Sequence, residues 1–176
     1  LDEVQCGVGR TGDFFAFEKS GVIPDIVPIA KGIGGGFPIG ACLLTNKVSS
    51  GMTPGTHGST FGGNPLAMSI GNGVLDVILA DGFFEKVKSI SKYFFEKLNK
   101  LKKNSNAIEE VRGRGLLKGI KLNKDIKKFI EILMKNKMLV VKAEEQVVRL
   151  LPPLIVTKKE IDESIKIINK SIHELK

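Results

Sequence analysis

Hydrophobic residues recur every three or four positions through the second half of the chain, which predicts amphipathic helices. One stripe follows Asp81, a suitable helix cap, and comprises Phe83, Val87, Ile90, Phe94, Leu98 and Leu101. A shorter stripe contains Ile126, Phe129, Ile130 and Leu133. The last one follows a capping box of Thr157 and Glu160, and comprises Ile161, Ile165, Ile168, Ile172 and Leu175.

Asn64–Leu79 is a further predicted helix, because Asn64 can cap it and Pro65 fits the first turn. Its expected buried face comprises Leu66, Ile70, Val74, Val77 and Ile78. Short apolar runs predict strands, at Asp25–Ala30, Ile39–Thr45, Glu109–Val111, Leu116–Leu122, Met138–Lys142 and Val147–Leu151. Pro28 cannot donate a hydrogen bond within a strand ladder, so we expect an edge or a bulge there.

The glycine content changes near residue 80, which predicts two regions. Between Gly7 and Gly63 lie 14 of the 20 glycines, whereas lysine-rich helical patterns dominate after residue 80. We therefore expect an α/β fold in which residues 1–80 end one domain and residues 81–176 form a smaller α+β domain. The run Leu1–Val4 resembles the end of a buried strand, so we expect the chain to be part of a longer protein.

The composition of the 176 residues, 42% hydrophobic and 26% charged, is that of a soluble globular protein. No apolar run approaches twenty residues, and no basic leader opens the chain, so we expect neither a membrane span nor a secretory signal. The two cysteines, Cys6 and Cys42, favour a reducing cytoplasm. The two histidines lack metal-ligand spacing. The lysines behind the net charge of +8 are spread along helices, which favours solvated faces over nucleic-acid binding.

Lys31 is the strongest candidate for chemistry. It follows a short apolar run and precedes a glycine-dense loop that extends to Gly40. Apolar surroundings disfavour the charged ammonium, and a neutral lysine amine forms Schiff bases with carbonyl compounds. The glycines leave room for a bulky ring. The pattern therefore predicts that Lys31 anchors an aldehyde cofactor.

Three other patterns are individually less specific. Gly7–Gly12 matches the G-x-G-x-x-G dinucleotide fingerprint, but an aromatic run replaces the expected helix, so a nicotinamide site is disfavoured.

The hydroxyls and glycines of His57–Pro65 suit a phosphate or carboxylate, or simply a capping turn. Arg149 lies in a strand with apolar residues on both faces; its guanidinium needs an anion, either a substrate carboxylate or a structural ion-pair partner.

In this order and spacing, these stretches resemble the class III, or ornithine-type, aminotransferases of fold type I, which depend on pyridoxal 5'-phosphate. The resemblance covers the whole chain through five stretches: Asp2-Glu3-Val4-Gln5, Gly7–Gly12, Ala30-Lys31-Gly32, Gly58–Pro65 and Arg149–Leu154. Within the class, Ser59-Thr60-Phe61 and Arg149–Leu154 are most similar to the branch that acts on N-acetylornithine in arginine biosynthesis. The resemblance implies that the protein is an enzyme. This chain would form the small domain and the end of the large domain.

The resemblance also implies a role for each matching residue. Lys31 would hold the cofactor as a Schiff base and later move the proton; Asp2 would pair with the ring nitrogen, and Gln5 would bind the ring hydroxyl beside Glu3 and Val4. Thr60 would bind the cofactor phosphate across a homodimer interface, Ser59 would lie near the substrate, and Arg149 would bind the substrate carboxylate. The substrates would be an amino donor and a 2-oxo acid.

The preferred amino donor stays open, because the N-terminal half that carries most specificity residues of the family is not in this sequence. Ornithine, 4-aminobutyrate and succinyl-diaminopimelate are alternatives to N-acetylornithine. A non-catalytic dinucleotide-binding α/β domain is an alternative of a different class. Because the sheet would lack partner strands, we expect the isolated chain to be inactive and poorly folded.

Overall fold

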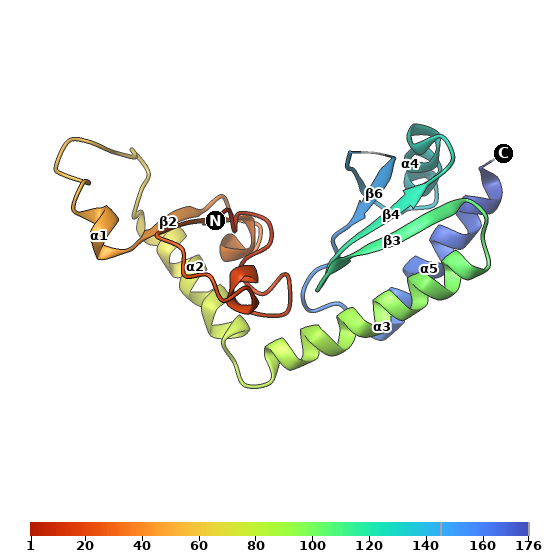
Figure 1. Cartoon of the computed structure of the whole chain (residues 1–176), viewed down its shortest axis with the longest axis horizontal. Coiled ribbons are helices and arrows are strands. Elements are labelled where there is room, and N and C mark those ends of the chain that lie inside the picture. The colour runs from red at the N-terminus through yellow and green to blue at the C-terminus, as the bar shows by residue number, and fades with distance from the viewer. Residues whose placement is uncertain (145, 176) are drawn as a thin grey trace. The chain divides into compact units, whose positions relative to one another are not determined.

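The computed structural model describes residues 1–144 and 146–175, which form two compact units, Leu1–Phe84 and Glu85–Lys176 (Figure 1). The division falls near the start of the long helix α3, Phe83–Lys103. The assignment of residues 1–80 to a large domain and 81–176 to a small domain stays a prediction, and positions 145 and 176 lie outside the described residues. Within that described part, no single helix is long and apolar enough to cross a membrane.

The first unit contains an antiparallel pair of strands, β1 (Ile26–Ala30) and β2 (Gly40–Leu44), as the sequence predicts. Residues 1–3 run alongside β1: the amine of Leu1 donates to the Ile26 carbonyl at 2.8 Å and the Glu3 amide donates to the Pro28 carbonyl at 3.0 Å. Pro28 has no backbone N–H, so it cannot donate a hydrogen bond to residues 1–3 between these two bonds. The ladder between β1 and residues 1–3 is therefore incomplete. The β1–β2 register has no bulge at Pro28, and residues 1–3 flank the other side of β1.

The core of this unit forms where the strands meet the 3₁₀ helix η2 (Lys31–Gly34) and the helix α2 (Pro65–Ile78). The buried members of the cluster are Val8, Val27, Ile29, Ile33 and Ile78. Asn64 caps α2 as predicted, since its side-chain oxygen accepts the Ala67 amide at 2.9 Å. Two short helices complete the unit, η1 (Ala16–Lys19) and α1 (Asn46–Ser49).

The predicted buried face of α2 is partly wrong. Ala67, Gly71 and Ile78 are the buried residues of the helix, whereas Leu66 and Val77 are 62% and 53% exposed. Small residues allow the backbone of α2 to approach η2 closely, so this unit buries the Ala67–Gly71 side of the helix rather than the Leu66–Val77 side.

The second unit is an antiparallel sheet in the order β3-β4-β6-β5, with helices α3, α4 and α5. Its strands are β3 (Ile108–Arg114), β4 (Leu117–Leu122), β5 (Val141–Lys142) and β6 (Val147–Leu150). The helices α4 (Ile126–Lys135) and α5 (Lys158–Glu174) begin at the caps Asp125 and Thr157. The predicted stripe of α3 is confirmed, because Val87, Ile90, Phe94, Leu98 and Leu101 are buried.

Candidate active site

Two neighbouring chain segments lead to predicted site residues. Residues 1–3 lead into Val4 and Gln5, and β1 leads into Lys31. Residues 1–3 and β1 run in the same direction, as the two hydrogen bonds to the carbonyls of Ile26 and Pro28 show. The chain beyond Glu3 and the chain beyond Ala30 therefore emerge at one edge. Sites in α/β proteins commonly form at the carboxyl ends of neighbouring parallel segments.

The backbone of Lys31 adopts the left-handed conformation, with φ of 50°. This region is uncommon for residues other than glycine, and such residues are concentrated at functional sites. The Lys31 side chain is exposed, and within the described residues its amine makes no hydrogen bond or ion pair. The glycines beside Lys31, which the sequence analysis expects to leave room for a ring, leave this amine open, and its role as the cofactor anchor stays a prediction.

Asp2 is exposed and lies in the segment that runs beside β1. Its Oδ1 accepts the Val4 amide at 2.8 Å, which fixes the carboxylate, and within the described residues Oδ2 accepts no hydrogen bond. Val4 and Gln5 follow in a turn and are half-buried. Together with Lys31, the edge offers a primary amine, a carboxylate and a carboxamide.

Glu3 faces away from these groups. It is 2% exposed, and its two carboxylate oxygens accept the amides of Ala16 and Phe17, each at 3.0 Å. These bonds tie residues 1–3 to the helix η1, so the observed contacts of Glu3 are structural, and its predicted place beside the cofactor ring stays a prediction. Burial, followed by a hydrogen bond with Glu3, raises the pKa of the neighbouring Cys6 thiol.

The run Gly7–Gly12 does not open a helix. Residues 4–15 form turns and bends, and the next element is the four-residue η1. A dinucleotide fingerprint requires a helix N-terminus directly after the glycines, so the structure gives no support to a nicotinamide site. Instead the run contains a buried valine, Val8, with φ of 56°. Sequence reasoning missed Val8; its only signal is that glycines flank it.

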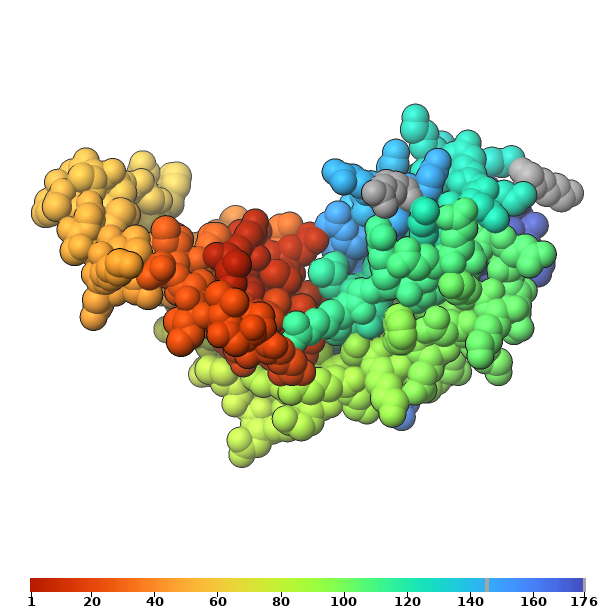
Figure 2. Space-filling view, viewed as in Figure 1, coloured from red at the N-terminus to blue at the C-terminus, as the bar shows by residue number. Residues whose placement is uncertain are grey.

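Ser59 and Thr60 lie in a long exposed loop. Every residue from 49 to 63 is exposed, and Figure 2 shows this orange-yellow segment as an arm that projects from the first unit. The Gly62 amide closes a turn on the Ser59 carbonyl at 3.2 Å, immediately before the cap of α2. The chain thus holds these hydroxyls on an arm away from its own β1–β2 pair, and their phosphate and substrate roles stay predictions.

Arg149 lies in β6 of the second unit, opposite Gly119 of β4 and Val141 of β5. Val147, Val148 and Leu150 are buried, as the apolar run predicts, whereas Arg149 is half-buried. It borders an open hollow together with Lys142, Ala143, Glu144 and Gln146. Its grouping with Lys31 stays a prediction, because the two residues belong to different units.

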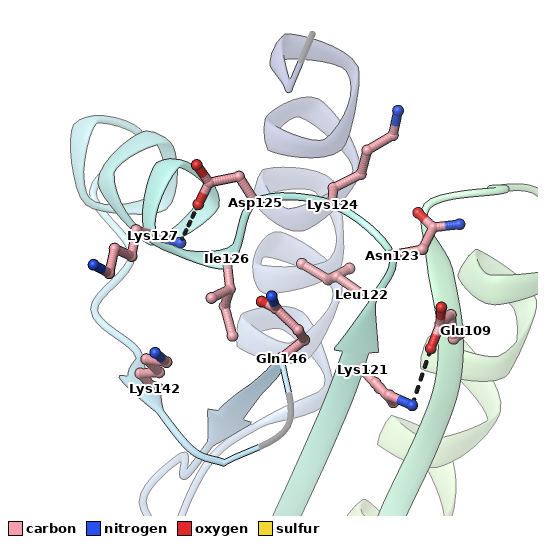
Figure 3. A pocket seen from close by; sticks show the side chains of 10 residues that line it. All are labelled: Glu109, Lys121, Leu122, Asn123, Lys124, Asp125, Ile126, Lys127, Lys142 and Gln146. Atoms are coloured by element: carbon pink, nitrogen blue, oxygen red, sulfur yellow. Dashed lines mark hydrogen bonds and ion pairs between the residues drawn. The ribbon is translucent and has the colours of Figure 1, made fainter.

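A second hollow of this unit begins at the cap of α4 and is drawn in Figure 3. Four lysines line it, but Lys121 is paired with Glu109 at 3.1 Å, and the ammonium groups of Lys124 and Lys127 point in opposite directions. The hollow therefore lacks a convergent set of groups, and no predicted site residue lines it. Among the described residues, no group of three or more acidic, histidine or cysteine side chains could hold a metal ion.

The donor set at the Lys31 edge fits pyridoxal 5'-phosphate. An amine can react with its aldehyde, a carboxylate oxygen can accept the ring N–H, and a carboxamide can bind the ring hydroxyl. A Cβ built on Gly36, in the loop that follows Lys31, meets nothing within 4 Å. Ser59 and Thr60, the residues predicted to bind the substrate and the phosphate, lie on the exposed arm.

Comparison with known proteins supports this interpretation. A family model described as aminotransferase class-III matches residues 1–172. The chain is 54% identical over 166 residues to the acetylornithine aminotransferase of Agrobacterium fabrum, covering 94% of this chain and 42% of that protein. The crystal structure of acetylornithine aminotransferase from Elizabethkingia anophelis matches with a TM-score of 0.88 and 35% identity, covering 98% of this chain and 46% of that one.

A third relative bears on the cofactor. The ornithine aminotransferase of Toxoplasma gondii, whose structure is described as having partial occupancy of PLP at the active site, matches with a TM-score of 0.90 and 32% identity. That match covers 99% of this chain and 42% of the Toxoplasma chain. The predicted fold class, the C-terminal part of a fold type I transferase, is confirmed. The chain spans less than half the length of these relatives, and it belongs to the class III aminotransferase family.

Proposed function

We propose that this chain is the lysine-bearing part of a pyridoxal 5'-phosphate-dependent aminotransferase. The enzyme would transfer an amino group between N-acetylornithine and 2-oxoglutarate in arginine biosynthesis. The observation that carries the proposal is that residues 1–3, which include Asp2, run beside β1, the strand that leads into the left-handed Lys31. The acetylornithine aminotransferases among its relatives support the choice of amino donor.

Each residue has a defined task in this proposal. When bound, pyridoxal phosphate supplies an aldehyde and an electron-withdrawing ring. Lys31 Nζ would hold the cofactor through its aldehyde carbon, with loss of water, and as a free amine would accept and return a proton as general base. Asp2 Oδ2 would accept the ring N–H and keep the ring cationic. Oδ1 of Asp2, fixed by the Val4 amide, sets the direction of that acceptor.

The remaining tasks are binding and orientation. Gln5 would bind the ring hydroxyl, with Glu3 and Val4 forming that wall, while Thr60 would bind the phosphate and Ser59 the substrate. Arg149 would bind the substrate carboxylate through two parallel hydrogen bonds. The exposed arm of residues 49–63 supports a homodimer in which Thr60 serves the partner's site. A cytoplasmic location follows from the same biosynthetic role.

Covalent trapping tests the lysine directly. The full-length enzyme, in which this chain is preceded by the N-terminal part that its relatives have, is loaded with pyridoxal phosphate and reduced with borohydride. Peptide mapping is expected to place the label on Lys31, and Lys31→Ala is expected to abolish both label and turnover. Lys47→Ala, at an exposed lysine of α1, is the matched control and should retain both. A label on any other lysine contradicts the proposal.

The amino donor is tested by competition. Full-length enzyme with 2-oxoglutarate is offered N-acetylornithine, ornithine, 4-aminobutyrate and succinyl-diaminopimelate, and kcat/KM is measured for each. N-acetylornithine is expected to have the highest value. A higher value for another donor would keep the aminotransferase assignment and replace the substrate.

A further inference from the structure

Two residues other than glycine share the left-handed conformation in one small region, Val8 with φ of 56° and Lys31 with φ of 50°. For a β-branched residue this conformation is a genuine outlier and is strained. It persists only where the surrounding structure over-determines it. Val8 meets that condition, because it is 1% exposed and belongs to the core of the first unit.

Val8 packs directly against the residue that follows Lys31. A Cβ built on Gly32 would lie 3.1 Å from Val8 Cβ, 3.5 Å from its Cγ1 and 3.7 Å from its carbonyl oxygen. The absence of a side chain at Gly32 is thus what lets Val8 approach the backbone there. Gly32 does not itself need a positive φ, so its role is the close approach and not a special conformation.

The same turn is pressed against the acidic run. The Gly7 amide donates to the Glu3 carbonyl at 3.0 Å, and a Cβ on Gly7 would lie 2.8 Å from that oxygen. Glu3 in turn donates its amide to Pro28 of β1 at 3.0 Å. A closed set of contacts therefore joins β1, residues 1–3, the Gly7–Val8 turn and the Lys31–Gly32 turn.

We propose that Val8 is a positioning residue for Lys31. Its side chain holds the backbone of Gly32, and through it keeps Lys31 left-handed and its amine directed toward the edge that carries Asp2. This inference rests on the proposed function, because it assumes that Lys31 is the attachment point of the cofactor. Val8 itself does not touch substrate or cofactor.

A bulk-swap series in the full-length enzyme tests the contact. Val8→Ala removes two methyl groups, Gly32→Ala places a methyl against Val8, and Val8→Ala combined with Gly32→Ala moves bulk from one side of the contact to the other. Lys47→Ala, at an exposed lysine of α1, is the control variant. Misplacement by about 1 Å can reduce rates on the order of 100-fold, so each of the first two variants is expected to lose 10- to 100-fold in kcat, with KM changed less than about threefold.

Two readouts separate positioning from general destabilisation. The first is the rate at which apo-enzyme captures pyridoxal phosphate, followed by borohydride labelling of Lys31. The second is the pH midpoint of the bound cofactor's absorption band. Both are expected to change in Val8→Ala and Gly32→Ala, and the double variant is expected to recover at least tenfold over the product of the single losses.

Two results would overturn the inference. One is strictly multiplicative behaviour of the single and double variants. The other is a lowered unfolding temperature in Val8→Ala with capture rate and pH midpoint unchanged, which would show a purely structural role. Failure of the proposed function is distinguishable, because it would leave Lys31 unlabelled in the wild-type enzyme.

Discussion

At the scale of single residues, Glu3 shows how one buried carboxylate organises the region around the site. It accepts two backbone amides, from Ala16 and Phe17, while almost fully removed from water. Glu3→Gln places an NH₂ donor opposite one of these N–H donors. Because an unsatisfied buried donor costs about 1–3 kcal/mol, we expect the free energy of unfolding to fall by that amount.

Hydrogen exchange is the measurement that localises this loss. The amides of Ala16 and Phe17 are expected to exchange faster in Glu3→Gln, while the amides of α2 change little. Glu18→Gln is the control, since Glu18 also accepts one backbone amide, that of Phe15 at 2.7 Å, but on the exposed surface. Equal losses in the two variants would show that burial of Glu3 does not matter.

Gly113 in β3 allows a second test at this scale. Its φ is 121°, and a Cβ built there would lie 2.1 Å from the Leu117 carbonyl oxygen across the hairpin. Because that neighbour is backbone, Gly113→Ala must distort the β3–β4 pairing, and we expect a loss of roughly 2–4 kcal/mol. Protection of the β4 amides against hydrogen exchange should fall, whereas Gly73→Ala should leave it unchanged. Unchanged protection in Gly113→Ala would contradict the geometry.

Sequence reasoning identified Lys31 from the apolar run before it and the glycine-rich loop after it, and its role as the cofactor anchor stays a prediction. Glycines permit close backbone approach. Sequence reasoning missed Val8, because valine strongly disfavours a positive φ and only the tertiary contact with Gly32 explains that conformation. Strain imposed by distant parts of the chain leaves no local signature.

At the scale of elements, helices were predicted well where local signals agree. The capping box of α5 forms as expected, with the Thr157 hydroxyl and the Glu160 carboxylate each accepting the other residue's amide. The burial of α2 was mispredicted because an apolar stripe shows which faces are hydrophobic, not which of them this chain covers. Strand β5 is shorter than predicted, Val141–Lys142 instead of Met138–Lys142.

The contact between α3 and α5 leads to a prediction on pH. Tyr93 donates its hydroxyl to Asp162 at 2.8 Å, and Lys97 pairs with the same carboxylate at 2.7 Å. The hydrogen bond with Lys97, then that with Tyr93, lowers the pKa of Asp162 below 3.8, and the bond with Asp162 raises the pKa of Lys97 above 10.5.

The sign of each effect fixes the pH window. A lowered carboxyl pKa adds stability that is present above about pH 3.8 and is lost as pH falls through the lower folded value. A raised lysine pKa adds stability that is present below about pH 10.5 and is lost at higher pH. We expect Asp162→Asn to weaken the α3–α5 contact between these limits and to remove the acid-side loss.

Denaturant midpoints measured from pH 6 to pH 2.5 check this expectation. The difference between wild type and Asp162→Asn should shrink as pH falls below 3.8, and added salt should reduce it, because the pair is exposed. Glu163→Gln, at the neighbouring exposed carboxylate, is the control and should show a smaller difference. A constant difference across this range would exclude the Asp162 pairing as its source.

At the scale of the whole molecule, the sequence predicts more residues of the candidate site than the fold of this chain brings together. Residues 1–3 run beside β1, the strand that leads into Lys31. Local patterns singled out the loop of Ser59 and Thr60 and the strand of Arg149, but only the resemblance assigned these residues roles in one site, since one pair lies on an exposed arm and the arginine in another unit. Contacts supplied by a second subunit or by the rest of a longer chain have no trace in local propensity.

Exposed apolar residues of the first unit lead to the last prediction. Ile23 is 89% exposed, Phe61 80%, and Leu66 and Val77 lie exposed on one face of α2. An apolar face of this kind favours binding of another chain or aggregation. Because the chain spans only 42% of its Agrobacterium relative, we expect the isolated chain to bind the dye ANS strongly and to lack transaminase turnover.

Complementation in trans tests whether the rest of the family's fold covers this face. The N-terminal part of the Agrobacterium fabrum relative, expressed separately and mixed with this chain, should reduce ANS fluorescence and restore turnover with pyridoxal phosphate. Leu66→Lys should impair that recovery, since a charge on a face to be buried costs several kcal/mol, whereas Lys47→Ala in α1 should not. Turnover by the isolated chain would show that Lys31 and Asp2 suffice without the rest of the relatives' fold, and that the exposed face of α2 has another purpose.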